Sequence, residues 1–442
     1  MMNPEFRRNL WLSFSTHRLI AMPALLALIF LTAAITAVNV PLILYNTASI
    51  LFILIAWGWG ALNAGASIVD EFREKTWDQQ RMSALGSWTM TWGKLFGATA
   101  FNWYGGAICL LVMVVCGTLS NRPNWVLEIP TLIAASILTH AMMIASNLYA
   151  GRFDSNFFRR GGAALIVLLF VVVGIGLQAT AMRISNPEPG STVVWWGMVV
   201  GDENIFLLES ALLFMVCATI AAWRLMSNAL QIRTLPWALP LFVLILAVYC
   251  GGFAEKKWFS LIGFAIAAGF SYIMLLTEPN TLLLWNKLRL RLQTGDWRSL
   301  LAELPLWTVT FLLTLVFALA VMLTWPFAAP DTRAIGALIP LVATVLLLRD
   351  VCIVLFFSFA PNARRPIAVA VLYIIVLNFL LPYFFEKLGL RAAAYFCDPV
   401  SDLFDTEPYG TVTLSLLIAS IHAAFMLGIV IWRFNKIRRQ TG

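Results

Sequence analysis

Charged side chains are scarce in this sequence. Asp, Glu, Lys and Arg make up 12% of the 442 residues, whereas 61% are hydrophobic. Soluble domains carry about one quarter charged residues, so this composition excludes an ordinary soluble protein. Apolar runs long enough to cross a bilayer as helices recur along the whole chain. The sequence therefore predicts an all-α polytopic membrane protein.

Histidine and cysteine are also few, with three His and six Cys scattered along the chain. No Cys-x-x-Cys occurs, and no cysteine stands at metal-ligand spacing from a histidine. We therefore predict neither a zinc site nor a disulfide framework. Cys397 is the only cysteine outside the predicted membrane helices. We expect no metal site and no catalytic residue in this chain.

A nucleotide-binding loop is absent as well. Gly86–Lys94 (GSWTMTWGK) resembles one superficially, but six residues separate its glycines and Leu95 follows the lysine. The phosphate-binding pattern is G-x-x-x-x-G-K-[ST], which this segment does not match. The net charge of +8 is explained by basic residues retained in cytoplasmic loops. We therefore expect no ATPase activity and no nucleic-acid partner.

The apolar segments predict twelve membrane spans, each of about 20 mostly apolar residues. No small-residue cleavage site follows the first run, so we expect that run to remain as a membrane helix. Residues 2–17 combine Arg7 and Arg8 with large apolar side chains, which predicts an amphipathic helix lying in the membrane interface. The spans are expected near residues 18–38, 45–69, 93–119, 128–151, 161–182, 204–227, 237–254, 258–277, 305–326, 335–359, 366–386 and 411–433.

Basic residues indicate the orientation of these spans. With a cytoplasmic N terminus, 22 of the 30 Lys and Arg residues fall in cytoplasmic segments, seven fall outside and Arg349 lies within a span. Basic loops tend to stay on the cytoplasmic side. We therefore expect an integral, multi-pass protein with both termini in the cytoplasm.

The two halves of the chain resemble each other. At an offset of 205 residues, Thr76 falls on Thr281 and the pair Arg159–Arg160 falls on Arg364–Arg365. Matches at equivalent places along the spans predict a parallel repeat of six helices. The expected domains are residues 1–235 and 236–442.

The longest polar interruption in the first half is Ala66–Lys94, between the second and third predicted spans. It has no proline from Glu71 onward and is compatible with a surface helix in which Glu74 and Asp78 lie one turn apart. Such a helix is expected to dock in a groove of a partner by burying its large apolar side chains, namely Trp77, Met82 and Leu85.

This stretch resembles the intracellular coupling segment of type-2 ABC exporter permeases, the ABC-2 family. That segment reads roughly Glu-Arg-Glu-x-Gly-Thr-Leu-Glu, followed by a helical turn and by Gly-Lys before the third span. Here Trp77 replaces the leucine, and the glycine before Thr76 is missing. The second half has Glu278, Thr281 and Leu282 at the corresponding spacing. The matching residues of the first half are Arg73, Glu74, Thr76, Trp77 and Asp78, then Gly93 and Lys94.

The resemblance implies a permease subunit of an ATP-binding cassette exporter in the bacterial inner membrane. ATP and Mg²⁺ would be bound by a separate ATPase subunit, expected in two copies, and this chain would hold no cofactor. The complex would contain either one fused permease chain or two, and the sequence leaves both open. The coupling segments, 70–92 and 278–300, would contact the ATPase. The residues implied in that contact are Arg73, Glu74, Thr76, Trp77, Asp78, Arg81, Glu278, Thr281 and Leu282.

Ionisable residues at membrane depth are functional candidates, because charge is costly there. Arg349 and Asp350 are adjacent, so their side chains should leave the helix about 100° apart. Each is expected to have another partner or to reach toward the cytoplasmic interface. His140 and His422 are better explained as interhelical hydrogen-bonding groups than as proton carriers. The resemblance places the second span near the translocation path, although its small residues also suit plain helix packing. The candidates for the path are Trp57, Trp59, Asn63, His140, Glu209, Arg349, Asp350 and His422.

Two external segments, 183–203 and 387–410, are expected to cap the outer side of the path, as the corresponding segment does in the ABC-2 family. Each carries an Asx-Pro pair, Asn186–Pro187 and Asp398–Pro399. An ordinary solvated loop is the alternative.

These observations favour an exporter permease that works by alternating access on a substrate the sequence does not name. The alternative is an ion- or proton-coupled secondary transporter that uses His140, Arg349, Asp350 and His422. A membrane enzyme acting on lipid or lipid-linked sugar would need a cluster of acid–base or metal-binding residues, which three scattered histidines do not supply.

Overall fold

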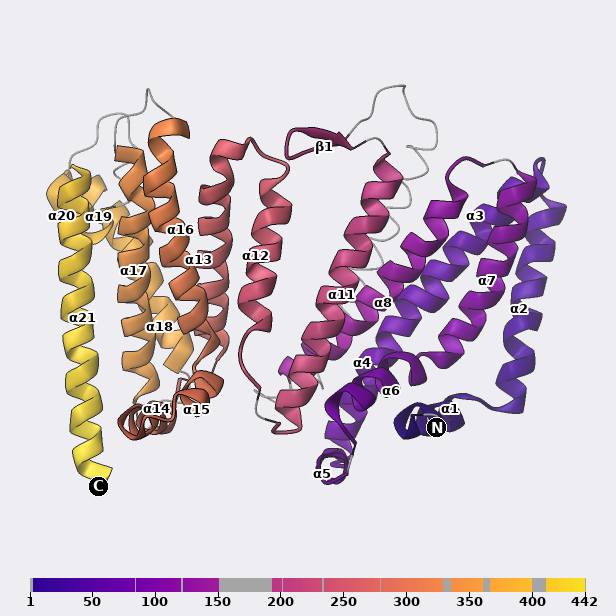
Figure 1. Cartoon of the computed structure of the whole chain (residues 1–442), viewed down its shortest axis with the longest axis horizontal. Coiled ribbons are helices and arrows are strands. Elements are labelled where there is room, and N and C mark those ends of the chain that lie inside the picture. Colours follow the sequence, from indigo (N-terminus) through magenta and orange to yellow (C-terminus); the bar gives the residue numbers. More distant parts are fainter. Residues whose placement is uncertain are drawn as a thin grey trace. The chain divides into compact units, whose positions relative to one another are not determined.

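The computed structural model describes most of the chain, which is almost entirely helical (Figure 1) with one short hairpin of β1 (Val193–Trp195) and β2 (Met198–Val200). Three predicted features lie outside the described residues: the span at 161–182, the repeated Arg159–Arg160 and Arg364–Arg365 pairs, and parts of both external segments, 183–192 and 400–410. The described residues are 3–150, 193–328, 335–360, 366–399 and 411–441, apart from positions 84, 121, 201, 233 and 279.

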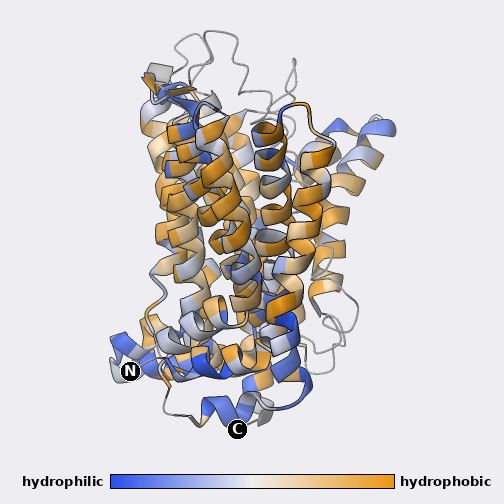
Figure 2. Ribbon diagram, turned by 90° about the vertical axis from the view of Figure 1, so that its right-hand side faces the viewer, coloured by the Kyte–Doolittle hydropathy of each residue, from blue (hydrophilic) through white to orange (hydrophobic). Residues whose placement is uncertain are grey.

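Ten helices of the described chain are long and apolar enough to cross a membrane. Figure 2 shows helices that are hydrophobic along their middle and hydrophilic mainly towards their ends. The protein is therefore a helical polytopic membrane protein, which confirms this part of the predicted fold class. The ten spans are Thr16–Ile35, Val40–Arg73, Ala100–Leu119, Trp125–Ala150, Glu203–Ala229, Lys256–Thr277, Leu306–Thr324, Ala337–Ser358, Pro366–Lys387 and Val412–Arg438.

The packing of the backbone divides the chain into two compact units. The first comprises Met1–Val193 and Val199–Thr234, and the second comprises Val194–Met198 and Leu235–Gly442. In the first unit, α8 packs against α11 and α4, and α3 packs against α7. Its helices are α1 (Pro4–Ser13), α2 (Thr16–Ile35), α3 (Val40–Phe52), the π-helix η1 (Ile53–Trp59), α4 (Gly60–Arg73), α5 (Trp77–Arg81), α6 (Ser87–Gly97), α7 (Ala100–Leu119), α8 (Trp125–Ala150) and α11 (Glu203–Ala229).

Local sequence signals set the helix ends near the N terminus. Asn3 caps α1, since its side-chain oxygen accepts hydrogen bonds from the amides of Glu5 and Phe6. Ser15 caps α2 in the same way, so the interfacial helix expected over residues 2–17 ends at Ser13. The third span, expected over 93–119, is likewise two helices, because α6 ends at Gly97 and α7 begins at Ala100.

In the second unit, α13 packs against α16, and α17 packs against α21. α12 is apolar but has only 14 residues, fewer than the other membrane helices. The helices of this unit are α12 (Ala238–Gly251), the 3₁₀-helix η2 (Lys256–Trp258), α13 (Phe259–Thr277), α14 (Leu282–Thr294), α15 (Trp297–Glu303), α16 (Leu306–Ala328), α17 (Ile335–Ser358), α18 (Pro366–Ile375), the π-helix η3 (Val376–Leu380), α19 (Leu381–Lys387), α20 (Arg391–Cys397) and α21 (Val412–Thr441).

Candidate functional site

The predicted coupling segment of the first unit is not one surface helix. α4 ends at Arg73, and Lys75 follows with a φ of 58°, in the left-handed region that side chains other than glycine rarely adopt. α5 then makes little more than one turn before the chain leads into α6. Glu74 and Asp78 therefore lie on opposite sides of a turn rather than one above the other on a helix.

Trp77 faces the protein and not a partner, so this part of the docking prediction is wrong. Its side chain is 7% exposed and stacks on Phe72, with ring centroids 4.6 Å apart. It belongs to an apolar core with residues of α4, α6, α8 and α11, and Leu85 packs against the same core. Hydrophobic burial thus anchors α5 to its own unit. Of the three apolar residues expected to dock, Met82 alone is open, with 81% exposure.

Around α5 the charged side chains point outward. Asp78 is 80% exposed and pairs with Arg81 at 3.2 Å, while Arg73 pairs with Asp70 at 3.8 Å. Such exposed pairs contribute little to stability, typically about 0.2–1 kcal/mol. They are therefore available to a partner without a large cost. We call Arg73, Glu74, Asp78, Arg81 and Met82 the α5 surface.

Next to the α5 surface lies a cluster of three buried charges and one half-exposed arginine, which the sequence did not predict. The Lys94 ammonium is fully buried and pairs with Glu71 at 2.6 Å and Glu5 at 3.3 Å. Arg8 pairs with the same two carboxylates, at 3.3 Å each. Two acids and two bases therefore balance. We call Glu5, Arg8, Glu71 and Lys94 the ion-pair cluster.

The ion-pair cluster joins three helices and the turn between them. Glu5 and Arg8 belong to α1, Glu71 to the last turn of α4, and Lys94 to α6. Gln80 of α5 also donates a hydrogen bond to the Glu71 carboxylate. A displacement of α5 would therefore disturb the contacts of Glu71, and through them the packing of α4, α6 and α1 against one another.

Two glycines of α6 let α1 approach closely enough to form this cluster. A Cβ at Gly93 would lie 2.5 Å from the Cβ of Glu5, and one at Gly97 would lie 2.9 Å from the Cβ of Asn9. Glycines spaced by four let helix backbones approach in this manner. The sequence contains one signal of this contact. Lys94 is a charged residue beside an apolar span, and it lies within a Gly-x-x-x-Gly pattern that is typical of close helix packing.

The coupling residues of the second unit serve as local structure. Glu278 follows α13, and its Oε2 accepts a hydrogen bond from the amide of Leu306 at 2.7 Å. Thr281 caps α14 by accepting from the amide of Leu284 at 3.4 Å, and Leu282 packs against the core. Of these three predicted residues, Thr281 alone is exposed. On the way to α16, Arg291 of α14 pairs with Glu303 of α15 at 2.6 Å.

At membrane depth in the first unit, polar side chains of α7 and α8 form hydrogen bonds with backbone carbonyl oxygens of η1. His140 Nε2 lies 2.8 Å from the Ala56 carbonyl oxygen, and the Asn102 amide donates to the Ile55 carbonyl oxygen at 3.0 Å. Asn63 in turn donates to Asn102 at 2.7 Å. A π-helical turn disturbs the regular hydrogen bonds of a helix, and hydrocarbon offers no replacement. His140 therefore acts as a hydrogen-bonding group between helices.

Trp57 and Trp59 lie in η1 but face different surroundings. Trp57 is 7% exposed within the unit, whereas Trp59 is 44% exposed and meets Phe101 edge to face at 5.8 Å. The role of either in a path stays a prediction, since the contacts of both are those of packed or membrane-facing aromatic side chains.

In the second unit, Arg349 and Asp350 bind each other, so the expectation that their side chains point apart is wrong, although each also has a further partner, as expected. The Arg349 guanidinium donates to Asp350 Oδ1 from Nε at 3.0 Å and from Nη2 at 2.8 Å. The Arg349 side chain is long enough to reach its neighbour in the chain, and an unpaired charge at this buried position would be costly. Tyr272 donates to Asp350 Oδ2 at 2.8 Å, and Asn378 accepts from Arg349.

Glu209 lies apart from these clusters, whereas His422 on α21 lies within electrostatic range of Arg349 on α17, the helix against which α21 packs. Glu209 is exposed on α11, less than two turns from its start. The His422 ring meets Phe396 edge to face at 4.6 Å, and its Nδ1 has no hydrogen-bond partner among the described residues. Within the second unit, three of the predicted path residues therefore lie near one another, namely Arg349, Asp350 and His422. Within the described ranges, no three His, Cys, Asp or Glu side chains are grouped to hold a metal.

Comparison of the chain with protein-family models, with curated proteins and with solved structures finds no match. The geometry of the α5 surface, the ion-pair cluster and the membrane-depth polar groups therefore carries the functional argument.

Proposed function

We propose that the chain is the permease of an ABC-2-type exporter, and that the α5 surface receives a separate ATPase subunit. The observation that carries the proposal is an exposed charged turn with a largely buried ion-pair cluster next to it. Gln80 joins α5 to Glu71, and Trp77 fixes the turn in the core. A partner that moves α5 would pull on the ends of three helices at once.

The backbone at Lys75 supports the resemblance to the ABC-2 coupling segment. In that segment a glycine precedes the threonine that corresponds to Thr76. Here Lys75 occupies the position and has a φ of 58°, a conformation that glycine adopts without penalty. The turn thus has a backbone conformation that suits glycine, the residue of the ABC-2 pattern, although lysine stands here.

The helix order of both units supports two six-helix halves. The second unit has six apolar helical segments, namely α12, α13, α16, α17, α18 to α19, and α21. The first has five spans, and the expected span at 161–182 lies outside its described residues. In both units a glutamate near the end of the second helix holds the chain before the third, with Glu71 binding Lys94 and Glu278 binding the Leu306 amide.

A continuous helix would connect the α5 surface to the membrane interior and so allow alternating access. α3, η1 and α4 form one continuous helix, so motion at Glu71 would reach the π-helical turn inside the membrane. There the carbonyls of Ile55 and Ala56 bond to side chains of α7 and α8, which can exchange partners as the helix shifts. An ATPase would drive the change only if its nucleotide-bound form binds one of the two permease states more tightly.

Charge reversal at Asp78 tests the proposal. Asp78→Lys should lose a co-purifying ATPase from mild-detergent extracts of the native membrane, while the membrane part stays folded. Glu255→Lys is a matched control, because Glu255 is 71% exposed and also forms a surface pair, with Lys257 at 2.7 Å. Equal recovery of an ATPase with both variants would refute the docking role of the α5 surface.

A secondary transporter is the second candidate, and one observation favours it. Asp350 is 1% exposed at membrane depth, and a tyrosine and an arginine hold it. Buried carboxylates of this kind are typical of proton and ion pathways. Transport driven by an ion gradient in proteoliposomes of the purified chain, without ATP, would select this function over the exporter.

A further inference from the structure

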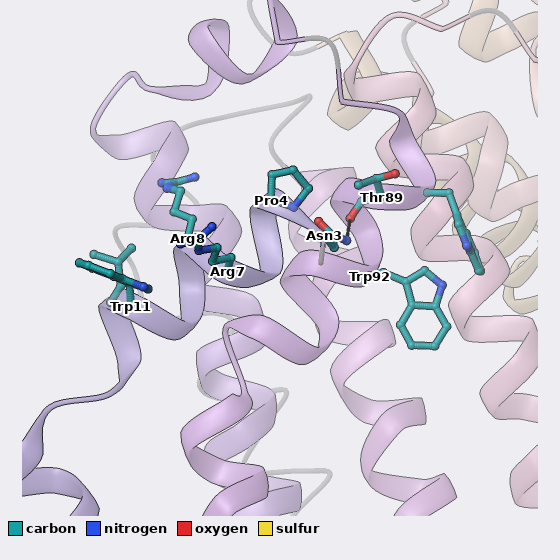
Figure 3. Close-up of a pocket in the computed structure, with 9 residues that line it drawn as sticks. Asn3, Pro4, Arg7, Arg8, Trp11, Thr89 and Trp92 are labelled. Atoms are coloured by element: carbon teal, nitrogen blue, oxygen red, sulfur yellow. Dashed lines mark hydrogen bonds between the residues drawn. The ribbon is translucent and has the colours of Figure 1, made fainter. Parts of the chain in front are cut away.

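A wide depression lies between α1 and α6 of the first unit. Its volume is about 1240 Å³. Figure 3 draws its lining side chains, with Arg7, Arg8 and Trp11 presented by α1, and Thr89 and Trp92 by α6. The two helices are tied at its edge, where the Asn3 amide donates to the Thr89 carbonyl oxygen at 2.6 Å.

The depression is electropositive. Arg7 and Arg8 are the only charged side chains among its nine lining residues. Arg8 already balances charge within the ion-pair cluster, whereas Arg7 is exposed and forms no ion pair with any described residue. The charge of Arg7 is therefore uncompensated, and it attracts an anion to the depression.

An apolar groove of about 770 Å³ adjoins this depression on the other face of α1. Asn3 and Trp92 line both, so the two spaces are neighbours across these side chains. Phe6 and Leu10 of α1 and Phe14 directly after it line the groove, and Tyr104 continues it along the first turns of α7. The groove thus extends from the helix ends towards a membrane-spanning helix.

The exposed side chains of α1 indicate that this face meets the bilayer. Trp11 is 81% exposed and Leu12 is 70% exposed, beside the two arginines. A short helix with adjacent basic and large apolar side chains lies in the interface between headgroups and acyl chains. Tryptophan is also enriched at this depth, where Trp88 and Trp92 stand 45% and 40% exposed.

We propose that the depression and the groove together bind one anionic phospholipid. Arg7 and Arg8 hold the phosphate headgroup, and the apolar groove takes an acyl chain. The lipid comes from the surrounding membrane, because a soluble phosphate would leave the adjoining groove unfilled. A bound lipid would fix α1 against α6, and thus hold the helix that contributes Glu5 and Arg8 to the ion-pair cluster. This inference concerns the permease alone and does not depend on an ATPase.

Native mass spectrometry of the delipidated, detergent-purified chain tests the inference. Phosphatidylglycerol should bind in preference to phosphatidylcholine of the same acyl chains. Arg7→Gln should weaken phosphatidylglycerol binding roughly fivefold, the factor expected for one basic residue facing an anionic lipid surface. Arg7→Lys keeps the charge and should retain the preference. Arg73→Gln removes an exposed arginine elsewhere at the helix ends and should leave binding unchanged.

Three results would overturn the proposal. The first is equal binding of the two lipids by the unmodified chain. The second is full retention of phosphatidylglycerol by Arg7→Gln. The third is competition by glycerol phosphate at the concentration of the lipid itself, which would indicate an anion site without an acyl-chain groove. Loss of ATPase docking in a separate assay would leave all three readouts unaffected.

Discussion

Replacement of Lys94 by methionine is expected to loosen α1 from the rest of the first unit. Methionine keeps the length and much of the volume of the lysine stem, so the change removes the charge with little loss of packing. Glu5 and Glu71, which are 3% and 7% exposed, would then share Arg8 as their one remaining cation in the cluster. Two buried carboxylates with one half-exposed arginine between them are poorly compensated.

The expected size of the effect follows from the burial. Removing one partner of a buried ion pair costs about 3–5 kcal/mol, because the other charge stays in a medium of low polarity. Lys94 pairs with two carboxylates, at 2.6 and 3.3 Å, and has no exposed surface. We therefore expect Lys94→Met to lower the free energy of unfolding by about 3–5 kcal/mol.

Chemical unfolding in mixed detergent and SDS micelles would measure this loss. Arg73→Gln is the control, because the Arg73–Asp70 pair is long, at 3.8 Å, and both side chains are more than half exposed. It should cost less than about 1 kcal/mol. A loss for Lys94→Met no larger than that of the control would refute the reasoning.

A double variant separates the charge effect from packing. Glu71→Gln with Lys94→Met removes one acid and one base, which leaves Glu5 paired with Arg8. The double variant should therefore be more stable than the sum of the two single losses predicts, by roughly 0.5–3 kcal/mol. Strict additivity would mean that the two groups do not interact as the distance implies.

Further predictions concern the membrane-depth groups and the second external segment. Gly60→Ala should cost about 1–3 kcal/mol in unfolding experiments, because its Cβ would lie 2.5 Å from His140 Nε2, whereas Gly428→Ala meets nothing within 4 Å and should cost far less. Asp350→Asn should destabilise the second unit by about 3–5 kcal/mol in the same assay, since it leaves a buried guanidinium without its carboxylate. Burial raises the pKa of the Cys397 thiol, so the reactive thiolate is depleted at neutral pH. Its labelling by an impermeant maleimide should be slower than that of glutathione and should accelerate as the pH rises; equal rates at neutral pH would contradict the assigned burial.

Composition and hydropathy predicted the membrane class because the bilayer constrains sequence strongly. An apolar run of about 20 residues has few alternatives to a membrane helix. Hydropathy did not predict the break between α6 and α7, because both helices are apolar enough to appear as one continuous run. The interruption follows Gly97 directly, and Gly97 and Gly93 are the residues at which α1 approaches α6 most closely, a contact between distant segments.

The details of the candidate site depended on contacts between distant segments. Glu5 and Lys94 are 89 residues apart, and nothing local to either indicates the other. Trp77 illustrates the opposite error, since a large apolar side chain on a polar segment suggests docking to a partner, whereas it fills a core within the same unit. Helix geometry predicted that the side chains of Arg349 and Asp350 point apart. The structure shows them paired, because a long arginine side chain can reach an adjacent residue.

Site-specific cross-linking would show whether the α5 surface contacts an ATPase subunit. A photo-crosslinking amino acid would replace Met82, which is 81% exposed on the α5 surface, or Trp11, which is equally exposed on α1. After irradiation of native membranes, we expect position 82 to capture a nucleotide-binding protein with a phosphate-binding loop, and position 11 not to capture it. Absence of such a protein at position 82, under conditions in which a known ABC complex is captured, would contradict the account.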